Sequence, residues 1–422
     1  MMVMATWQGL LGLATFPLIA WLLGERRRAR VPWRVVISAF VLQMVFALLL
    51  LRIPGSAVLL LGLNRVALTL QEATDAGTGF VFGYLGGGPL PFAETMPGAS
   101  FILAFKVLPL VLVISALSAL LYYWGVLPLV ARVLALLLRR VMGISGALAL
   151  AAATHIYVGM IEAPLLIRPY LAGMQRGELF AVMTCGMAGI AGTMMVLYAS
   201  LIGPVLPGAL GHILVASVIS TPAALGMAAL MVPFDTAEDR GKEKGLGASL
   251  SVEEAPAGAL DALVKGTRDG IAPLIGILTV LIVAVALVHL VNDALFLMPG
   301  SPSLQELAAW PFRPLMWLAG IPSDQVGVAA GLMGQKTIIN EFVAYNGLAH
   351  LPVGTLDAHA RLIVTYALCG FANLGSAGIL IGGMGAMVPA RRAEIAALGL
   401  RSVLSGTLAT CMSGAVAGLL LG

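Results

Sequence analysis

The stretch GQKTIINEFVAY, Gly334 to Tyr345, places Lys336, Asn340 and Glu341 inside strongly apolar sequence. The whole chain is 60% hydrophobic and only 10% charged, so these three groups stand where lipid would reject them. Polar groups that are costly to bury in a membrane commonly carry function. The sequence therefore predicts that this stretch lies inside the protein and belongs to a functional site.

Two other stretches share these properties. GMIEAP, Gly159 to Pro164, and CGFANLGSAG, Cys369 to Gly378, are short, punctuated by glycine and flanked by apolar runs. We group them with GQKTIINEFVAY as parts of one candidate site.

Composition decides the class of protein. A mean hydropathy of +1.00 over 422 residues excludes an ordinary soluble domain, of which about a quarter of the residues are charged. The apolar runs are continuous for about 20 residues, as in spanning helices, and do not alternate as in a barrel. This predicts an all-α polytopic membrane protein. The net charge is +4, and the basic residues cluster at the ends of apolar runs. This distribution indicates membrane topology and not nucleic-acid binding.

Eight transmembrane helices are expected from the apolar runs. They cover residues 7–23, 35–51, 100–124, 179–202, 213–232, 271–290, 362–387 and 394–421. Arginines after the first run reverse the charge order of a signal peptide, so we expect that helix to be retained. Placing the basic clusters in the cytoplasm puts both termini on the outer side of the membrane.

Two further segments have polar residues that a spanning helix would expose to lipid. Residues 144–170 contain His155 and Glu162, and residues 326–351 contain the Asn340-Glu341 pair. A re-entrant hairpin can bury such a polar tip against protein, so we predict two hairpins that open from opposite sides.

The chain then divides into four parts. They are scaffold helices with amphipathic interfacial helices (1–143); the first hairpin, a broken helix and a following helix (144–232); a cytoplasmic linker, a scaffold helix and an external loop (233–325); and the second hairpin, a broken helix and the last helix (326–422). We expect interfacial helices within 53–98 and around Arg132 to Arg140, and helix breaks at 186–192 and 373–376. The order of elements repeats with opposite orientation, and such inverted repeats build the substrate site of secondary transporters.

At this point the motifs resemble a known family. GQKTIINEFVAY, TYALCGFAN at 365–373 and GFVFG at 79–83 are similar to the concentrative nucleoside transporter family, and the similarity covers nearly the whole chain in order. The resemblance implies eight transmembrane helices with two hairpins, a homotrimer, and symport of nucleosides into the cell with sodium or protons.

The resemblance also implies roles for single residues. Glu341, Asn373 and Ser376 correspond to groups that bind the ribose hydroxyls, and Phe371 lines the same site. A vicinal diol fits a carboxylate and an amide in a dry pocket. Glu162 corresponds to a glutamate near the nucleobase, and Met194, in the broken helix 179–202, completes the candidate substrate-binding set.

The first hairpin departs from the family pattern. Met160 and Ile161 stand where the family has a glutamine and a hydroxyl that touch the base, so the base preference of relatives does not transfer to this chain. His155 and Gly189 stand where sodium-coupled relatives have an asparagine and a serine. Since hard cations prefer oxygen ligands, we expect protons to be the coupling ion.

Glu341, Glu162 and His155 are the candidate titrating groups. A neutral His155, hydrogen-bonded within the hairpin, is the alternative reading of that residue. Lys336 either pairs with Glu341 or holds backbone carbonyls of the hairpin.

Other functions stay open as alternatives. They are sodium-coupled nucleoside transport, a gate-type membrane protein for another solute, a passive channel, and an intramembrane enzyme. The sequence GSAG at 375–378 does not match the GxSxG elbow of hydrolases. We expect no cofactor and no metal site, because the three cysteines lack CxxC spacing and the histidines lack an HExxH pattern.

Overall fold

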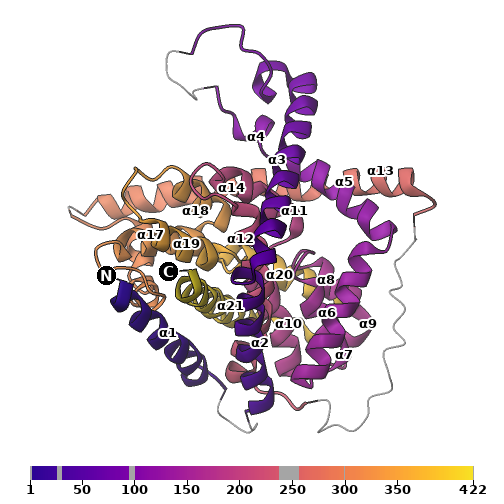
Figure 1. The fold of residues 1–422 in the computed structure, drawn as a ribbon, viewed down its shortest axis with the longest axis vertical. Helices are drawn as coiled ribbons and strands as arrows, with labels where there is room; N and C mark the ends of the chain where they lie inside the picture. Colours follow the sequence, from indigo (N-terminus) through magenta and orange to yellow (C-terminus); the bar gives the residue numbers. More distant parts are fainter. Residues whose placement is uncertain (1, 26–30, 95–99, 237–255, 299, 422) are drawn as a thin grey trace.

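The computed structural model describes residues 2–25, 31–94, 100–236, 256–298 and 300–421, apart from the side chains of 2–6, 54–61, 63, 64 and 67. The first-loop arginines 26–28 and 30, and the predicted linker beyond residue 236, lie outside the described residues. Every regular element in the described part is a helix (Figure 1).

Six helical segments in the described residues are long and apolar enough to cross a membrane. They are Trp33–Leu51, Leu103–Tyr123, Arg176–Ile202, Ala209–Met231, Ala259–Phe296 and Pro389–Leu421. Two shorter apolar helices, Trp7–Leu22 and Leu374–Met387, add to them. These eight segments overlap the eight predicted helices and confirm the all-α membrane class. The number of crossings stays a prediction, since only length and composition select the segments.

The N-terminal third contains α1 to α6. The bounds are α1 (Met2–Leu22), α2 (Trp33–Leu51), α3 (Pro54–Phe82), the short η1 (Gly83–Gly86), α4 (Leu103–Lys106), α5 (Leu110–Tyr123) and α6 (Val126–Met142). The apolar part of 53–98 forms one 29-residue helix, α3, which begins at Pro54. In Figure 1 the end of α3 rises away from the body together with α4.

The predicted helix 100–124 is interrupted, which the sequence analysis did not anticipate. Pro109 lies between α4 and α5 and has no N–H to continue the helical ladder. The chain continues past this point through hydrogen bonds between residues three apart, as in a 3₁₀ turn. They run from the Leu110 amide to the Val107 carbonyl at 3.2 Å and from the Val111 amide to the Leu108 carbonyl at 3.0 Å.

The two predicted hairpins are each built from short helices around a break. The first has α7 (Gly146–Thr154), α8 (Glu162–Leu166) and α9 (Arg168–Leu171), and the second has α17 (Val326–Ile338) and α18 (Glu341–Ala349). Asn340 starts α18, because its Oδ1 accepts the Val343 amide at 3.0 Å. In Figure 1 the two hairpins lie on opposite sides of the body, with α20 and α21 between them.

The two interrupted helices are α10 (Arg176–Ala188) with α11 (Gly192–Ile202), and α19 (Ala358–Leu368) with α20 (Leu374–Met387). The second break was predicted at 373–376 and lies instead at 369–373. Asn373 is the reason, because its side chain caps α20 and so places Ser376 inside the helix.

The core is built around two long helices, α12 (Ala209–Met231) and α21 (Arg392–Leu421), the latter preceded by η2 (Pro389–Arg391). α21 packs against α1, α10, α12, α19 and α20. The interrupted helices therefore pack against both α12 and α21. This shared packing brings the two helix breaks together.

Residues 256–325 contain more helix than the linker, single scaffold helix and loop that were predicted. The bounds are α13 (Ala259–Asp269), α14 (Ile271–Phe296), α15 (Leu304–Ala309) and α16 (Phe312–Leu318). α13 packs against α5, and Gly266 permits this approach, since a Cβ there would lie 2.5 Å from the Ala119 Cβ.

Candidate functional site

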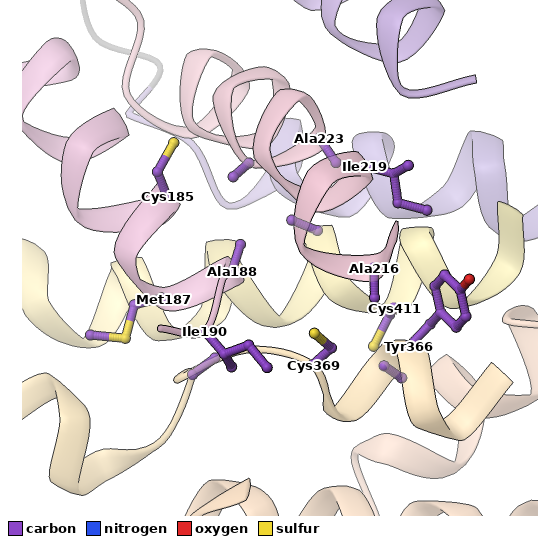
Figure 2. Packing of buried hydrophobic residues seen from close by; sticks show 14 of the residues in the cluster. Cys185, Met187, Ala188, Ile190, Ala216, Ile219, Ala223, Tyr366, Cys369 and Cys411 are labelled. Atoms are coloured by element: carbon purple, nitrogen blue, oxygen red, sulfur yellow. The ribbon is translucent and has the colours of Figure 1, made fainter. Parts of the chain in front are cut away.

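The two helix breaks cross inside the protein. The Phe371 amide donates to the Gly189 carbonyl at 3.2 Å, which joins the break of α19–α20 to that of α10–α11. Figure 2 labels Ile190 on the first of these connections and Cys369 on the second. Gly370 permits the contact, because a Cβ there would lie 2.7 Å from the Met187 carbonyl oxygen. The crossing leaves backbone groups of both breaks inside protein and away from lipid.

A carboxylate and an amide meet beside this crossing. Asn373 Nδ2 donates to Glu341 Oε2 at 2.8 Å, and both residues are buried. Asn373 Oδ1 accepts the Ser376 amide at 2.6 Å, which fixes the orientation of the amide with its NH₂ toward Glu341. Glu341, Asn373 and Ser376 are therefore joined, and each comes from the first turn or N-cap of a helix after a break.

Tyr198 completes this cluster and was missed by the sequence analysis. Its hydroxyl donates to Glu341 Oε1 at 2.7 Å, and its side chain is fully buried in α11. One signal could have found it. Tyr198 lies four residues after Met194, on the same face of the helix that follows the first break.

A second tyrosine supports the first. The rings of Tyr198 and Tyr345 stack with centroids 4.9 Å apart and an interplanar angle of 28°. The Tyr345 hydroxyl donates to the Thr365 carbonyl at 2.8 Å, which anchors the pair to α19. The phenol that bonds Glu341 is therefore held by a ring that is itself fixed.

Lys336 is fully buried in the second hairpin. Its Nζ donates to the Ala367 carbonyl at 2.9 Å, near the C-terminal end of α19. A cation is favourable at this end of a helix, where unpaired carbonyls gather. Holding a backbone carbonyl is one of the two roles that the sequence left open for this residue.

His155 lies at the end of α7 and is 2% exposed. Its ring lies beside the backbone of Val182 in α10. Within the described residues, Nε2 has no hydrogen-bond partner. The ring also lies against Gly186, where a Cβ would come within 3.2 Å of Cε1. An imidazole thus fills the space between the first hairpin and α10.

The other candidates of the first hairpin lie apart from the Glu341 hydrogen bonds. Met160 is buried against Gly186, and Ile161 packs on Gly383 of α20. Glu162 is exposed, and its carboxylate lies over Gly159, where an added side chain would displace it. Met194 is buried and Phe371 is half-buried. Hydrogen bonds join Glu341, Asn373 and Ser376, while the side chain of Glu162 is exposed.

Three family profiles match the chain. One described as "Na+ dependent nucleoside transporter C-terminus" matches residues 212–418, and its N-terminal counterpart matches 11–85. A third, described as "Gate: Nucleoside recognition", matches residues 104–205 between them.

Full-length relatives agree with these profiles. The chain is 36% identical to an uncharacterised transporter of Haemophilus influenzae, over 99% of both chains. It is 33% identical to the nucleoside permease NupC of Helicobacter pylori, over 100% of this chain and 99% of the relative. Among solved structures, CNTnw in an inward-facing substrate-bound state aligns with a TM-score of 0.88 and 35% identity, over 99% of this chain and 98% of that chain.

Proposed function

Because this chain belongs to the concentrative nucleoside transporter family, we propose that it is a secondary symporter that imports nucleosides, with the ribose bound by Glu341, Asn373 and Ser376. We further propose that it works as a homotrimer in the bacterial inner membrane, with both termini in the periplasm. The family and the solved relative are transporters and not enzymes.

The observation that carries this proposal is the buried hydrogen bond of 2.8 Å between Asn373 and Glu341. A carboxylate accepts hydroxyl donors, and an amide both donates and accepts, so the pair suits a sugar diol. Because both side chains are buried, each bond to the sugar is stronger than it would be in water. We propose Phe371, two residues before Asn373, and Met194, one helical turn before Tyr198, as the apolar residues of this site.

The base-binding side of the site differs in character. Met160 and Ile161 offer no hydrogen bond to a base, which leaves the exposed carboxylate of Glu162 as the polar side chain of the stretch GMIEAP, Gly159 to Pro164. We propose that contacts to the base are mainly apolar and that the sugar provides most of the selectivity.

Proton coupling is the second part of the proposal. His155 occupies the space against α10 with an imidazole, and Gly189 offers no side-chain oxygen. Sodium prefers oxygen ligands, whereas an imidazole binds a proton. His155, Glu341 and Glu162 are the candidate proton-binding groups. Sodium coupling is the alternative, and the description of the matching profile favours it.

Uptake of labelled uridine into proteoliposomes tests the sugar site. Glu341→Gln and Asn373→Ala are expected to abolish uptake without loss of folded protein. Glu306→Gln, which changes an exposed carboxylate in α15, is the matched control and should transport normally. Equal affinity for uracil and uridine would contradict the assignment of Glu341 and Asn373 to ribose. Release of a cleaved product would support the enzyme alternative, and equilibration without accumulation would support a channel.

Imposed ion gradients test the coupling. A proton gradient should drive accumulation of uridine, and a sodium gradient at fixed pH should not. The double variant His155→Asn with Gly189→Ser restores the residue types of sodium-coupled relatives and is expected to introduce stimulation by sodium. Stimulation of the unchanged protein by sodium at fixed pH rejects proton coupling.

A further inference from the structure

We infer that Tyr198 is a specificity-determining positioning residue, which orients the Glu341 carboxylate so that it selects a sugar with two adjacent hydroxyls. The inference rests on the proposed function, because it assumes that Glu341 binds the sugar. It adds a residue of the first repeat to the hydrogen-bonded group of Glu341, Asn373 and Ser376, which comes from the second repeat.

The geometry of the carboxylate carries this inference. Glu341 Oε1 accepts the Tyr198 hydroxyl at 2.7 Å, and Oε2 accepts Asn373 Nδ2 at 2.8 Å. Each carboxylate oxygen has about two lone-pair directions, so one direction remains on each oxygen. Two adjacent hydroxyls can occupy these directions together, whereas a sugar with one hydroxyl leaves a buried acceptor unpaired.

Tyr198 and Asn373 also fix the plane of the carboxylate. With a donor on each oxygen, rotation about the last side-chain bond of Glu341 breaks at least one hydrogen bond. Loss of the tyrosine hydroxyl would leave a single donor and allow that rotation. The affinity for a riboside, which bonds both carboxylate oxygens, should then fall more than the affinity for a deoxyriboside, which bonds one.

The position of the tyrosine hydroxyl is itself constrained. The ring is fully buried, stacks on Tyr345 at 4.9 Å and lies 6.3 Å from the Phe342 ring. A phenylalanine at position 198 would keep these ring contacts and remove only the hydroxyl. The substitution therefore separates the hydrogen bond from the packing.

The simpler reading is that Glu341 merely satisfies a buried tyrosine hydroxyl. The two readings differ in one measurable quantity, which is the ratio of the affinities for a riboside and for the matching deoxyriboside. A purely structural hydroxyl lowers both affinities together, whereas a positioning hydroxyl changes the ratio.

The experiment measures inhibition of uridine uptake by uridine, 2′-deoxyuridine and 3′-deoxyuridine in proteoliposomes. In Tyr198→Phe we expect the uridine affinity to fall roughly tenfold, the value of one hydrogen bond to a charged group. The affinities for both deoxyribosides should fall by less than about threefold. The ratio of riboside affinity to deoxyriboside affinity should therefore decrease. Equal losses for all three compounds, or no loss, would overturn the inference.

Tyr366→Phe is the matched control. It also removes a buried tyrosine hydroxyl, but this hydroxyl lies 3.2 Å from His212 Nδ1 and does not bond Glu341. We expect an unchanged ratio of riboside to deoxyriboside affinity. Should Tyr198→Phe fail to fold, 3-fluorotyrosine at position 198 strengthens the donor and should widen the ratio, and an unchanged ratio then overturns the inference.

The failure of this inference is distinguishable from that of the proposed function. If Glu341→Gln retains its preference for ribosides, the sugar site itself is wrong. If Glu341→Gln abolishes uptake while Tyr198→Phe keeps the unchanged ratio, only the role of Tyr198 is wrong.

Discussion

Arg176 holds Glu25 through two hydrogen bonds, from Nη2 to Oε1 at 2.9 Å and from Nε to Oε2 at 3.2 Å. Arg401 adds a third bond to Oε1 at 2.8 Å. Glu25 lies just after α1, Arg176 starts α10 and Arg401 belongs to α21. One carboxylate therefore joins three helices at a single end of the molecule.

Removal of this carboxylate is expected to lower stability in a pH-dependent way. The hydrogen bond from Arg176 holds the pKa of Glu25 below its ordinary value. The stabilisation is therefore complete above the ordinary pKa and is lost as the pH falls through the lower, folded value. Because Glu25 is partly exposed, we expect less than about 1 kcal/mol. Thermal unfolding of the wild type and Glu25→Gln should differ at pH 7 and converge in acid. A difference in melting temperature that does not shrink as the pH falls below the ordinary pKa of Glu25 would contradict this.

Substitution of Gly370 should separate the two crossing helix breaks. A Cβ there would lie 2.7 Å from the Met187 carbonyl oxygen and 2.9 Å from Thr410 Cγ2, both in packed surroundings. We expect Gly370→Ala to destabilise the protein by about 1–3 kcal/mol and to reduce uptake. Gly378→Ala is the control, since no atom lies within 4 Å of its Cβ, and it should be tolerated. Normal uptake and melting in Gly370→Ala would show that the crossing is not needed in this form.

Loss of the Asn340 cap should weaken the start of α18, which carries Glu341. Asn340→Ala removes the bond of 3.0 Å to the Val343 amide and is expected to cost about 1 kcal/mol. Uridine affinity should fall as well, because Glu341 is the first residue of that helix. Asn346→Ala changes the same residue type later in α18 and should leave affinity unchanged. Similar melting temperatures and affinities for both variants would reject the cap's role.

Replacement of Lys336 should harm stability more than an ordinary lysine substitution. In Lys336→Met the Ala367 carbonyl loses its buried donor, at an expected cost of about 1–3 kcal/mol. Lys265→Met, which changes an exposed lysine in α13, is the comparison and should have a small effect. Unfolding in detergent measures both variants, and equal stabilities would argue against a supporting role for the ammonium.

Sequence reasoning was effective where a polar residue interrupts apolar sequence. Glu341 was singled out because lipid rejects a carboxylate, and the family resemblance paired it with Asn373. The structure joins the two side chains at 2.8 Å. Their assignment to ribose stays a prediction. The hairpins followed from the same cost, since His155 and Glu162 could not face lipid along one spanning helix.

Other features carry no such cost and were missed or misplaced. Tyr198 is an aromatic residue in an apolar helix, where packing is the ordinary explanation, and its partner is 143 residues away in the sequence. The interruption at Pro109 depends on one missing N–H within an apolar run. α13 was hidden because its charged residues resemble those of the preceding linker.

The double use of Asn373 links binding to folding. Its amide oxygen begins α20, and its NH₂ holds Glu341. A sugar that moves this amide therefore also disturbs the hydrogen bond that caps the first turn of α20. A substitution at Asn373 changes ligand affinity and the local order of that helix together.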